Sequence, residues 1–514
     1  MAKTKKYFEQ DWFIVLILFV IAAMIRIIPE IKAGIWPIGY DTFNSYVADI
    51  SSYNGPLFNW IRSANILYFL FLPLKIIGIK PLIIMKIFGP LLYGFLTVSF
   101  YYFLRKFLKF SPIKACLGGL LLIFQLGALR ISWDLFRNEL GLIFFFLAMI
   151  NLGKIKENRH LIYFILSSIL VVLSNQLVTV ILIVVTGIYW LSLLKNKKYP
   201  EVWRLLIPGA IVAFLFSMVI NFPGKTLYDS HIIFTSESNY FGFYFYAYKK
   251  VMSYGQLTNL IITLFLLLFS FLLPLALYGF WLLRKNIILT AMTLWLLAGT
   301  FSSLIFAGYG LIVWDRWLVM LVFPFVIYAV HGAFYLGSLI GGIKKWAQKL
   351  PALAWALSAI FWLSFFGLFI WRDIPFLTAS YADAKKPFAN DAINSYFPRT
   401  MVHNSVGIWK IQSTLDCVQW LNKRTPPGSA IIVDNRYRGL MMTSFDMDNR
   451  YIITNSWSET LQNSNLEIAQ NHGYWPIYLI WNTSHSIDGF DRLYASGDTG
   501  VYVALPPAYD SENF

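Results

Sequence analysis

Cysteine and charged residues are both scarce in this sequence. Only two cysteines, Cys116 and Cys417, occur in 514 residues. They lie about 300 positions apart, which excludes a disulfide framework, a zinc ribbon and an iron–sulfur cluster. Charged residues make up 13% of the chain, whereas hydrophobic residues make up 58% and the mean hydropathy is +0.60. Water-soluble domains carry about 25% charged residues, so the composition predicts a membrane protein.

The net charge of +16 is unevenly distributed along the chain. Residues 372–514 contain 11 Lys+Arg against 14 Asp+Glu, whereas residues 1–371 contain 31 against 12. The positive charge therefore belongs to the apolar part, as expected of cytoplasmic loops between membrane spans. This distribution argues against nucleic-acid binding, although the isoelectric point is near 9.5.

The apolar part divides into eleven candidate spans, because a span needs roughly 20 mostly apolar residues. The first span follows a basic tail and lacks the small-residue pattern of a signal-peptide cleavage site. Arg26 and Glu30 close it, so we expect an uncleaved span with a cytoplasmic N-terminus. The expected spans cover residues 12–29, 83–104, 113–130, 139–153, 160–174, 176–193, 205–221, 257–283, 287–307, 317–340 and 351–371.

Basic residues gather at every second connection between these spans. The clusters lie at residues 105–114, 154–159, 195–204, 284–285 and 344–349. Because Lys and Arg collect on the cytoplasmic side, this alternation predicts an inside N-terminus and an outside C-terminus. The apolar stretch Leu67–Ile79 would invert the order if it were a span. We expect it to be interfacial or re-entrant within a first outer loop at 30–82, broken by Pro73 and Gly78.

Residues 372–514 differ in character from the apolar part, which we take as residues 1–371. Asp, Asn and Ser become frequent, and short alternating apolar runs replace the long ones. This pattern predicts a separate α/β domain outside the membrane. We expect helices near 414–422 and 459–471, and strands at 430–434, 451–454, 477–481 and 501–504.

The ionisable residues of the apolar part lie mostly beside the outer ends of the expected spans. Asp41 follows the first span in GYDTFNSYVAD, and Arg62 lies later in the same outer loop. The next outer loop reads WDLFRNELG and contains Asp134, Arg137 and Glu139, and the tenth span opens with WDRW, which contains Asp315 and Arg316. Charges at membrane depth are costly, so we expect these side chains to face one water-filled cavity or to pair with each other.

This arrangement resembles the GT-C fold of polyprenyl-phosphate-dependent glycosyltransferases, which include protein O-mannosyltransferases, aminoarabinose transferases and oligosaccharyltransferases. The shared features are a long first outer loop with the early Asp41, an acidic cluster on the next outer loop, an arginine at a late outer span end and an external C-terminal domain. The segment DCVQWLNKRTPPGSAIIVDNRYRG also resembles the entry to the external domain of archaeal oligosaccharyltransferase-like members. VDNRYRG stands where oligosaccharyltransferases have WWDYG.

The resemblance implies a membrane enzyme that transfers a sugar from a lipid-linked phosphate donor to a protein, lipid or glycan acceptor, with inversion. Asp41 is then the candidate general base. Arg316, followed by Arg137 and Arg62, would bind the carrier phosphate, because the planar guanidinium matches phosphate oxygens. Asp134 and Glu139 would orient the acceptor, hold a divalent cation such as Mg²⁺ or Mn²⁺ together with Asp41, or pair with Arg137.

Each of these residues also has a purely structural interpretation. Asp41 could cap a helix in the first outer loop, Asp134 and Arg137 could form a local ion pair, and Arg316 could anchor a span end. The alternative functions are a transporter or flippase, or a polysaccharide polymerase or ligase. A transporter should show paired halves with broken spans and charges at mid-membrane. The sequence shows neither feature, which favours a glycosyltransferase.

Overall fold

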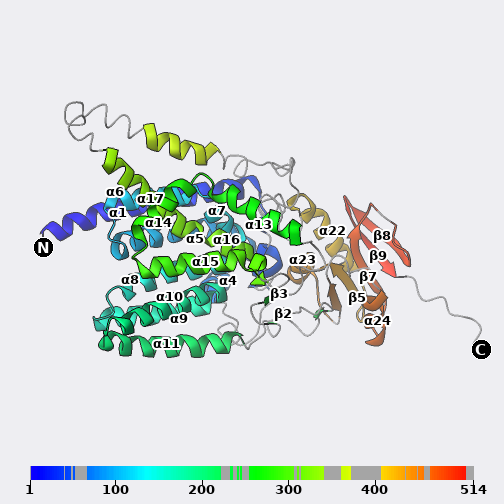
Figure 1. Ribbon diagram of the computed structural model, residues 1–514. Coiled ribbons are helices and arrows are strands. Elements are labelled where there is room, and N and C mark those ends of the chain that lie inside the picture. The colour runs from blue at the N-terminus through cyan, green and yellow to red at the C-terminus, as the bar shows by residue number, and fades with distance from the viewer. Residues whose placement is uncertain are drawn as a thin grey trace, which may run out of the picture.

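The computed structural model combines a helical bundle with a six-stranded sheet that lies at one end of the bundle (Figure 1). It describes residues 2–39, 41–47, 50–51, 66–220, 232–234, 240–241, 244–245, 254–305, 310–311, 314–340, 360–371, 407–434, 436–448, 450–455, 463–484 and 486–504.

The bundle consists of apolar helices that run roughly alongside one another (Figure 1). They are α1 (Ala2–Lys32), α5 (Pro81–Tyr102), α6 (Pro112–Ile123), α7 (Leu126–Asp134), α8 (Phe136–Leu152), α9 (Asn158–Ser174), α10 (Gln176–Lys195), α11 (Tyr199–Ile220), α13 (Tyr254–Phe269), α14 (Leu273–Leu283), α15 (Ile287–Ile305), α16 (Trp314–Met320) and α17 (Val322–Ile340). Shorter elements are the π-helical turns η1 (Thr42–Val47) and η2 (Phe103–Phe107), the helix α4 (Ile66–Ile76) and the helix Ile360–Trp371.

Among the described residues, five helices are long and apolar enough to cross a membrane, and the number rises to seven if two bent pairs each count as one span. The five are Asp11–Lys32, Pro81–Phe107, Gln176–Lys195, Tyr199–Val219 and Trp314–Leu336. These helices make the chain a membrane protein, as the composition predicts. The expected total of eleven spans stays a prediction.

Two segments that we expected as single helices are broken. The expected span 113–130 falls on α6 and α7, and the chain bends by 63° between these two helices. The expected span 257–283 falls on α13 and α14, and the chain bends by 83° between them. Gln125 has an extended backbone between α6 and α7, and Pro274 lies in the first turn of α14, where its missing N–H is tolerated. Both breaks lie within apolar runs, so hydropathy alone does not reveal them.

Most of the stretch Leu67–Ile79, which we expected to be interfacial or re-entrant, lies in the helix α4. Its 11 residues extend about 16 Å, which is too short for a hydrocarbon core of about 30 Å. Leu67, Tyr68 and Phe71 are buried against the rest of the protein. The length of α4 agrees with a segment that does not span the membrane.

The six strands of the C-terminal sheet lie in the order β1-β6-β5-β7-β9-β8. Their bounds are β1 (Ile232–Phe234), β5 (Ala430–Asp434), β6 (Tyr451–Asn455), β7 (Ile477–Asn482), β8 (Phe490–Ser496) and β9 (Thr499–Ala504). The first four in the order are parallel, and β9 and β8 are antiparallel to their neighbours. The four strands expected from the sequence are present, whereas β8 and β1 were not foreseen. β1 comes from the connection between the expected spans 205–221 and 257–283, so the sheet includes a strand from outside residues 372–514.

Three helices cover the two faces of this sheet: α22 (Ile408–Arg424), α23 (Arg438–Ser444) and α24 (Asn463–Asn471). The buried residues Ile431 and Val433 of β5 belong to the same apolar cluster as residues of α22, α23 and the helical bundle. Ile432 and Leu479 face the other way and pack with α24. A further small sheet joins β2 (Tyr240–Phe241), β3 (Tyr244–Phe245) and β4 (Gly310–Leu311).

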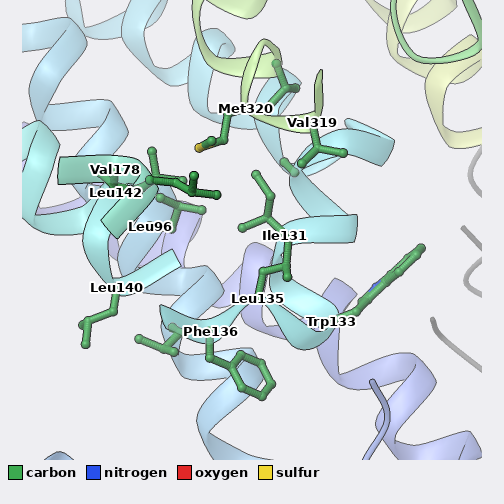
Figure 2. Packing of buried hydrophobic residues seen from close by; sticks show 14 of the residues in the cluster. Leu96, Ile131, Trp133, Leu135, Phe136, Leu140, Leu142, Val178, Val319 and Met320 are labelled. Atoms are coloured by element: carbon green, nitrogen blue, oxygen red, sulfur yellow. The ribbon is translucent and has the colours of Figure 1, made fainter. Parts of the chain in front are cut away.

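The core of the bundle surrounds the junction of α7 and α8. Figure 2 shows Trp133, Leu135 and Phe136 projecting in different directions at this junction, while Val319 and Met320 of α16 approach Ile131. All of these side chains are at least 95% buried. Burying this much apolar surface fixes the position of the polar residue in the middle of the junction, Asp134.

Candidate functional site

The site begins with an ion pair between two segments that are far apart in the sequence. Asp41 directly precedes η1, and Arg316 lies in the first turn of α16. Their Oδ2 and Nη2 atoms are 3.7 Å apart, and the side chains are 28% and 30% exposed. The pair is therefore close enough to interact and still accessible from outside the protein. The sequence placed both residues in the site, and the structure brings them together.

Asp134 lies next to this pair but is paired with a different arginine. Its carboxylate forms an ion pair with Arg130, one helical turn earlier on α7. Asp134 is 2% exposed. α7 ends at Asp134, and Arg137 belongs to the next helix, so the local pair between Asp134 and Arg137 that the sequence allowed stays a prediction. The i,i+4 spacing of Arg130 and Asp134 was the sequence signal for the actual pair.

Tyr46 lies at the centre of these charges. Its hydroxyl donates a hydrogen bond of 3.3 Å to the backbone oxygen of Asp134, and its ring packs against Phe136 with centroids 5.3 Å apart. Burial and then the negative charge of Asp41 raise the pKa of Tyr46, while Arg137 and Arg316 act in the opposite direction. The hydroxyl is therefore a neutral donor that lies within electrostatic reach of four expected site residues. Sequence reasoning did not select it.

The segment that contains Asp41 and the segment that contains Asp134 approach each other at Gly39. Its φ of +104° is a conformation that L side chains rarely adopt. A Cβ atom at this position would lie 2.2 Å from the carbonyl oxygen of Trp133 and 2.9 Å from Cβ of Asp134. Glycine therefore allows the Asp41 segment to lie directly against the end of α7.

The other expected site residues have different positions. The Nε of Arg137 donates a 3.3 Å hydrogen bond to the carbonyl oxygen of Ser174. Glu139 is fully buried on α8, and neither carboxylate oxygen has a hydrogen-bond partner among the described residues. Arg26 of α1 lies within electrostatic range of this carboxylate. Arg62 lies outside the described residues.

A metal site formed by Asp41, Asp134 and Glu139 does not fit this arrangement. No three His, Cys, Asp or Glu side chains group as metal ligands within the described part of the chain. Asp41 and Asp134 each face an arginine, and Glu139 is buried near Arg26. A divalent cation would have to compete with these guanidinium groups for the carboxylate oxygens.

The C-terminal sheet reaches this site through α23. This helix follows β5 and packs against η1, so the carboxyl ends of the parallel strands point toward η1. Figure 1 shows α22 and α23 between the bundle and the sheet. At the end of β5, Asp434 accepts hydrogen bonds from the backbone N–H of Arg436 (2.7 Å) and from its Nε (3.0 Å). Burial raises the pKa of Asp434, and Arg436 opposes this shift.

Comparison with solved structures reveals a similar fold. The oligosaccharyltransferase of Archaeoglobus fulgidus, crystallised in complex with Zn and sulfate, aligns with a TM-score of 0.50 at 13% sequence identity. The alignment covers 90% of this chain and 68% of the oligosaccharyltransferase. No known protein family and no curated protein matches this sequence. At 13% identity the likeness concerns the fold, and the chain has a GT-C-like fold.

Proposed function

We propose that this protein is a membrane glycosyltransferase that uses a lipid-linked phosphate sugar as its donor. The observation that carries the proposal is the accessible Asp41–Arg316 pair, with a 3.7 Å separation, beside the buried Asp134 on a GT-C-like fold. Glycosyl transfer from a lipid phosphate needs a base for the acceptor and a cation for the leaving group. The pair supplies one of each.

In the proposed reaction, the acceptor hydroxyl or amide attacks the anomeric carbon of the donor sugar. A bond forms from the acceptor atom to this carbon while the bond from the carbon to the phosphate oxygen breaks, which inverts the configuration. Asp41 takes the acceptor proton, and the lipid phosphate leaves with the bonding electrons. Arg316 stabilises the negative charge on the departing phosphate.

Asp134 contributes through its position. It is buried and paired with Arg130, so it does not compete with Asp41 for the acceptor proton in this arrangement. Its backbone oxygen holds the hydroxyl of Tyr46, which orders η1 beside Asp41. We therefore assign Asp134 and Tyr46 to the wall of the site. Arg137, on the same wall, is the second candidate for the phosphate, as is Arg62 in the first outer loop.

The acceptor would approach from the side of the C-terminal sheet. α23 packs on η1, and the end of β5 contains Asp434 and Arg436. In our proposal this side is extracytoplasmic, as the distribution of Lys and Arg in the loops indicates.

The experiment is to reconstitute the purified protein in vesicles with a synthetic polyprenyl-phosphate sugar and a mixture of hydroxyl and amide acceptors. A glycosyltransferase should release free polyprenyl phosphate in amounts equal to the glycosylated product. A transporter or flippase would move the donor across the bilayer and leave the bond between sugar and phosphate intact, and that result would contradict the proposal. Heat-inactivated protein in the same vesicles is the control.

A further inference from the structure

A buried ion pair lies inside the bundle near the C-terminal end of α1, behind the proposed site. Arg26 and Glu30 are 0% and 1% exposed, and their Nη1 and Oε1 atoms are 2.9 Å apart. Lys86 of α5 lies 3.7 Å from the other Glu30 oxygen and donates hydrogen bonds to the backbone oxygens of Glu30 and Trp36. Apolar side chains of similar size are often as stabilising as a buried ion pair, so stability alone is a weak reason for these charges.

Glu30 contacts the segment that carries Asp41. Its Oε2 accepts a 3.2 Å hydrogen bond from the backbone N–H of Ile38, three residues before Asp41. The carbonyl oxygen of Ile38 in turn accepts a 2.6 Å hydrogen bond from the hydroxyl of Thr42, the residue after Asp41. Asp41 is thus enclosed in a short turn whose N-terminal end is attached to Glu30.

Arg26 contacts the segment that carries Asp134. Its Nε donates a 2.9 Å hydrogen bond to the carbonyl oxygen of Ser132, two residues before Asp134. Ser132 is itself fully buried. One ion pair on α1 therefore contacts both acid-bearing segments, one through each partner.

The surroundings leave Arg26 little freedom. A Cβ atom on Gly89 would lie 2.8 Å from its Nη2, so α5 passes directly against the guanidinium. Glu139 of α8, which is also fully buried, lies within electrostatic range of Arg26. Arg26 thus pairs with Glu30 on its own helix and lies directly against α5. The catalytic role expected for Glu139 from the sequence stays a prediction.

We infer that the Arg26–Glu30 pair is a positioning element that holds the Asp41 segment and the Asp134 segment in register. Through its hydrogen bond to Ile38, Glu30 fixes the position of the turn that contains Asp41. Through its hydrogen bond to Ser132, Arg26 fixes the position of the end of α7, against which Gly39 packs. The inference rests on the proposed function, since it assigns the pair to the alignment of a reactive carboxylate. Neither residue touches substrate.

The test replaces the pair with apolar residues of similar size, Arg26→Met together with Glu30→Leu. Lys86 keeps its two backbone acceptors in this variant. The matched control is Asp11→Leu with Arg105→Met, which removes another largely buried ion pair, of 3.1 Å, between η2 and the N-terminal half of α1. Both variants lose one ion pair that involves α1, and only the first should affect the site.

The first readout is amide hydrogen exchange, which needs no reaction. Without Glu30, the N–H of Ile38 loses its acceptor, so the peptide containing residues 36–42 should exchange about 10-fold faster or more, as should residues 132–135. The control variant should exchange like wild type in both peptides. Unchanged exchange in the Arg26/Glu30 variant would overturn the inference regardless of activity.

The second readout is single-turnover transfer together with the melting temperature and donor affinity. Misplacing a reacting group by about 1 Å can cost about 100-fold in rate, so we expect at least a 10-fold loss of turnover at an unchanged or higher melting temperature and near wild-type donor affinity. Faster exchange with wild-type turnover would contradict the inference. If wild-type protein transfers no sugar, the proposed function fails, and the exchange data alone then decide whether the pair holds the two segments.

A more conservative variant covers the case in which the double variant does not fold. Arg26→Lys keeps the positive charge beside Glu30 but lacks the Nε donor that reaches Ser132. Faster exchange should then be confined to residues 132–135, with Ile38 protected as in wild type. An effect on the Ile38 peptide of equal size would show general loosening of α1 and would contradict separate roles for the two partners.

Discussion

Arg316 is the residue whose charge the proposed chemistry needs most directly. A lipid phosphate is negative before and during transfer, so its counter-ion should contribute to donor binding as well as to turnover. Arg316 lies at the start of α16, 3.7 Å from Asp41, and remains 30% exposed. A span-end anchor would show the same exposure, so substitution is needed to separate the two roles.

We predict that Arg316→Ala weakens donor binding and slows transfer, with a total loss of about 2 to 4 kcal/mol in transition-state stabilisation. Arg316→Lys should recover only part of this loss, because an ammonium lacks the planar fork of the guanidinium. Donor titration and steady-state kinetics of both variants measure the two effects. Wild-type donor affinity in Arg316→Ala would contradict the phosphate-binding role and indicate that Arg316 only anchors the end of a span.

At the scale of elements, the critical contact is that of the η1 segment with the end of α7. Gly39 makes this contact possible, since its missing side chain and its φ of +104° allow the two backbones to meet. Gly34 has a similar left-handed backbone, with a φ of +67°, but nothing lies within 4 Å of its Cβ position. Alanine substitutions at these two positions therefore distinguish the effect of backbone strain from the effect of steric contact.

Gly39→Ala should therefore reduce transfer by roughly 10-fold or more, because the added methyl group forces the Asp41 segment away from Trp133 and Asp134. Gly34→Ala should cost only about 1 to 2 kcal/mol of stability from its backbone conformation and leave the transfer rate unchanged. Parallel measurement of melting temperature and initial rate distinguishes the two variants. Equal rates in Gly39→Ala and Gly34→Ala would show that the close contact does not matter for the reaction.

Much of the element pattern could be predicted from the sequence because it follows from local composition. The helices of the bundle follow apolar runs, and AIIVD forms the buried strand β5 at the expected residues. The breaks after Ile123 and after Phe269 were not predictable, since apolar residues continue through both. β1 was also missed, because a three-residue strand gains its hydrogen bonds only from a partner far away in the sequence.

The candidate site could be predicted in part. Clusters of charge beside apolar runs identified Asp41, Asp134 and Arg316, and the structure places them around Tyr46. The pairing was not predictable from proximity in sequence alone: Asp134 pairs with Arg130, and Glu139 turns away into the bundle. Such choices depend on where helices begin and end, and one residue of difference redirects a side chain by about 100°.

At the scale of the whole molecule, the proposal requires the site and the C-terminal sheet to lie on the outer side of the membrane. α23 packs on η1, so the sheet and the Asp41 segment share one side of the bundle. The basic residues around Arg105 and Lys109 belong to the opposite side in our scheme. The orientation of the chain in the membrane can therefore be measured at one position on each side of the bundle.

We predict that an impermeant thiol reagent labels Asn471→Cys in intact cells but not Lys109→Cys. Both positions are exposed, so accessibility depends on the side of the membrane and not on burial. Permeabilised cells, in which both variants should react, provide the control. Labelling of Lys109→Cys in intact cells would invert the orientation and place the proposed site in the cytoplasm.

The most direct test of the account is single-turnover transfer by Asp41→Asn beside Asp41→Ala. A general base acts only as the proton leaves, so Asp41→Asn should fold and bind donor like wild type while its turnover falls by about 100-fold or more. If Asp41 only caps the start of η1, asparagine would cap as well as aspartate, and only Asp41→Ala would lose about 1 kcal/mol of stability. Wild-type turnover in Asp41→Asn would contradict the central role of Asp41.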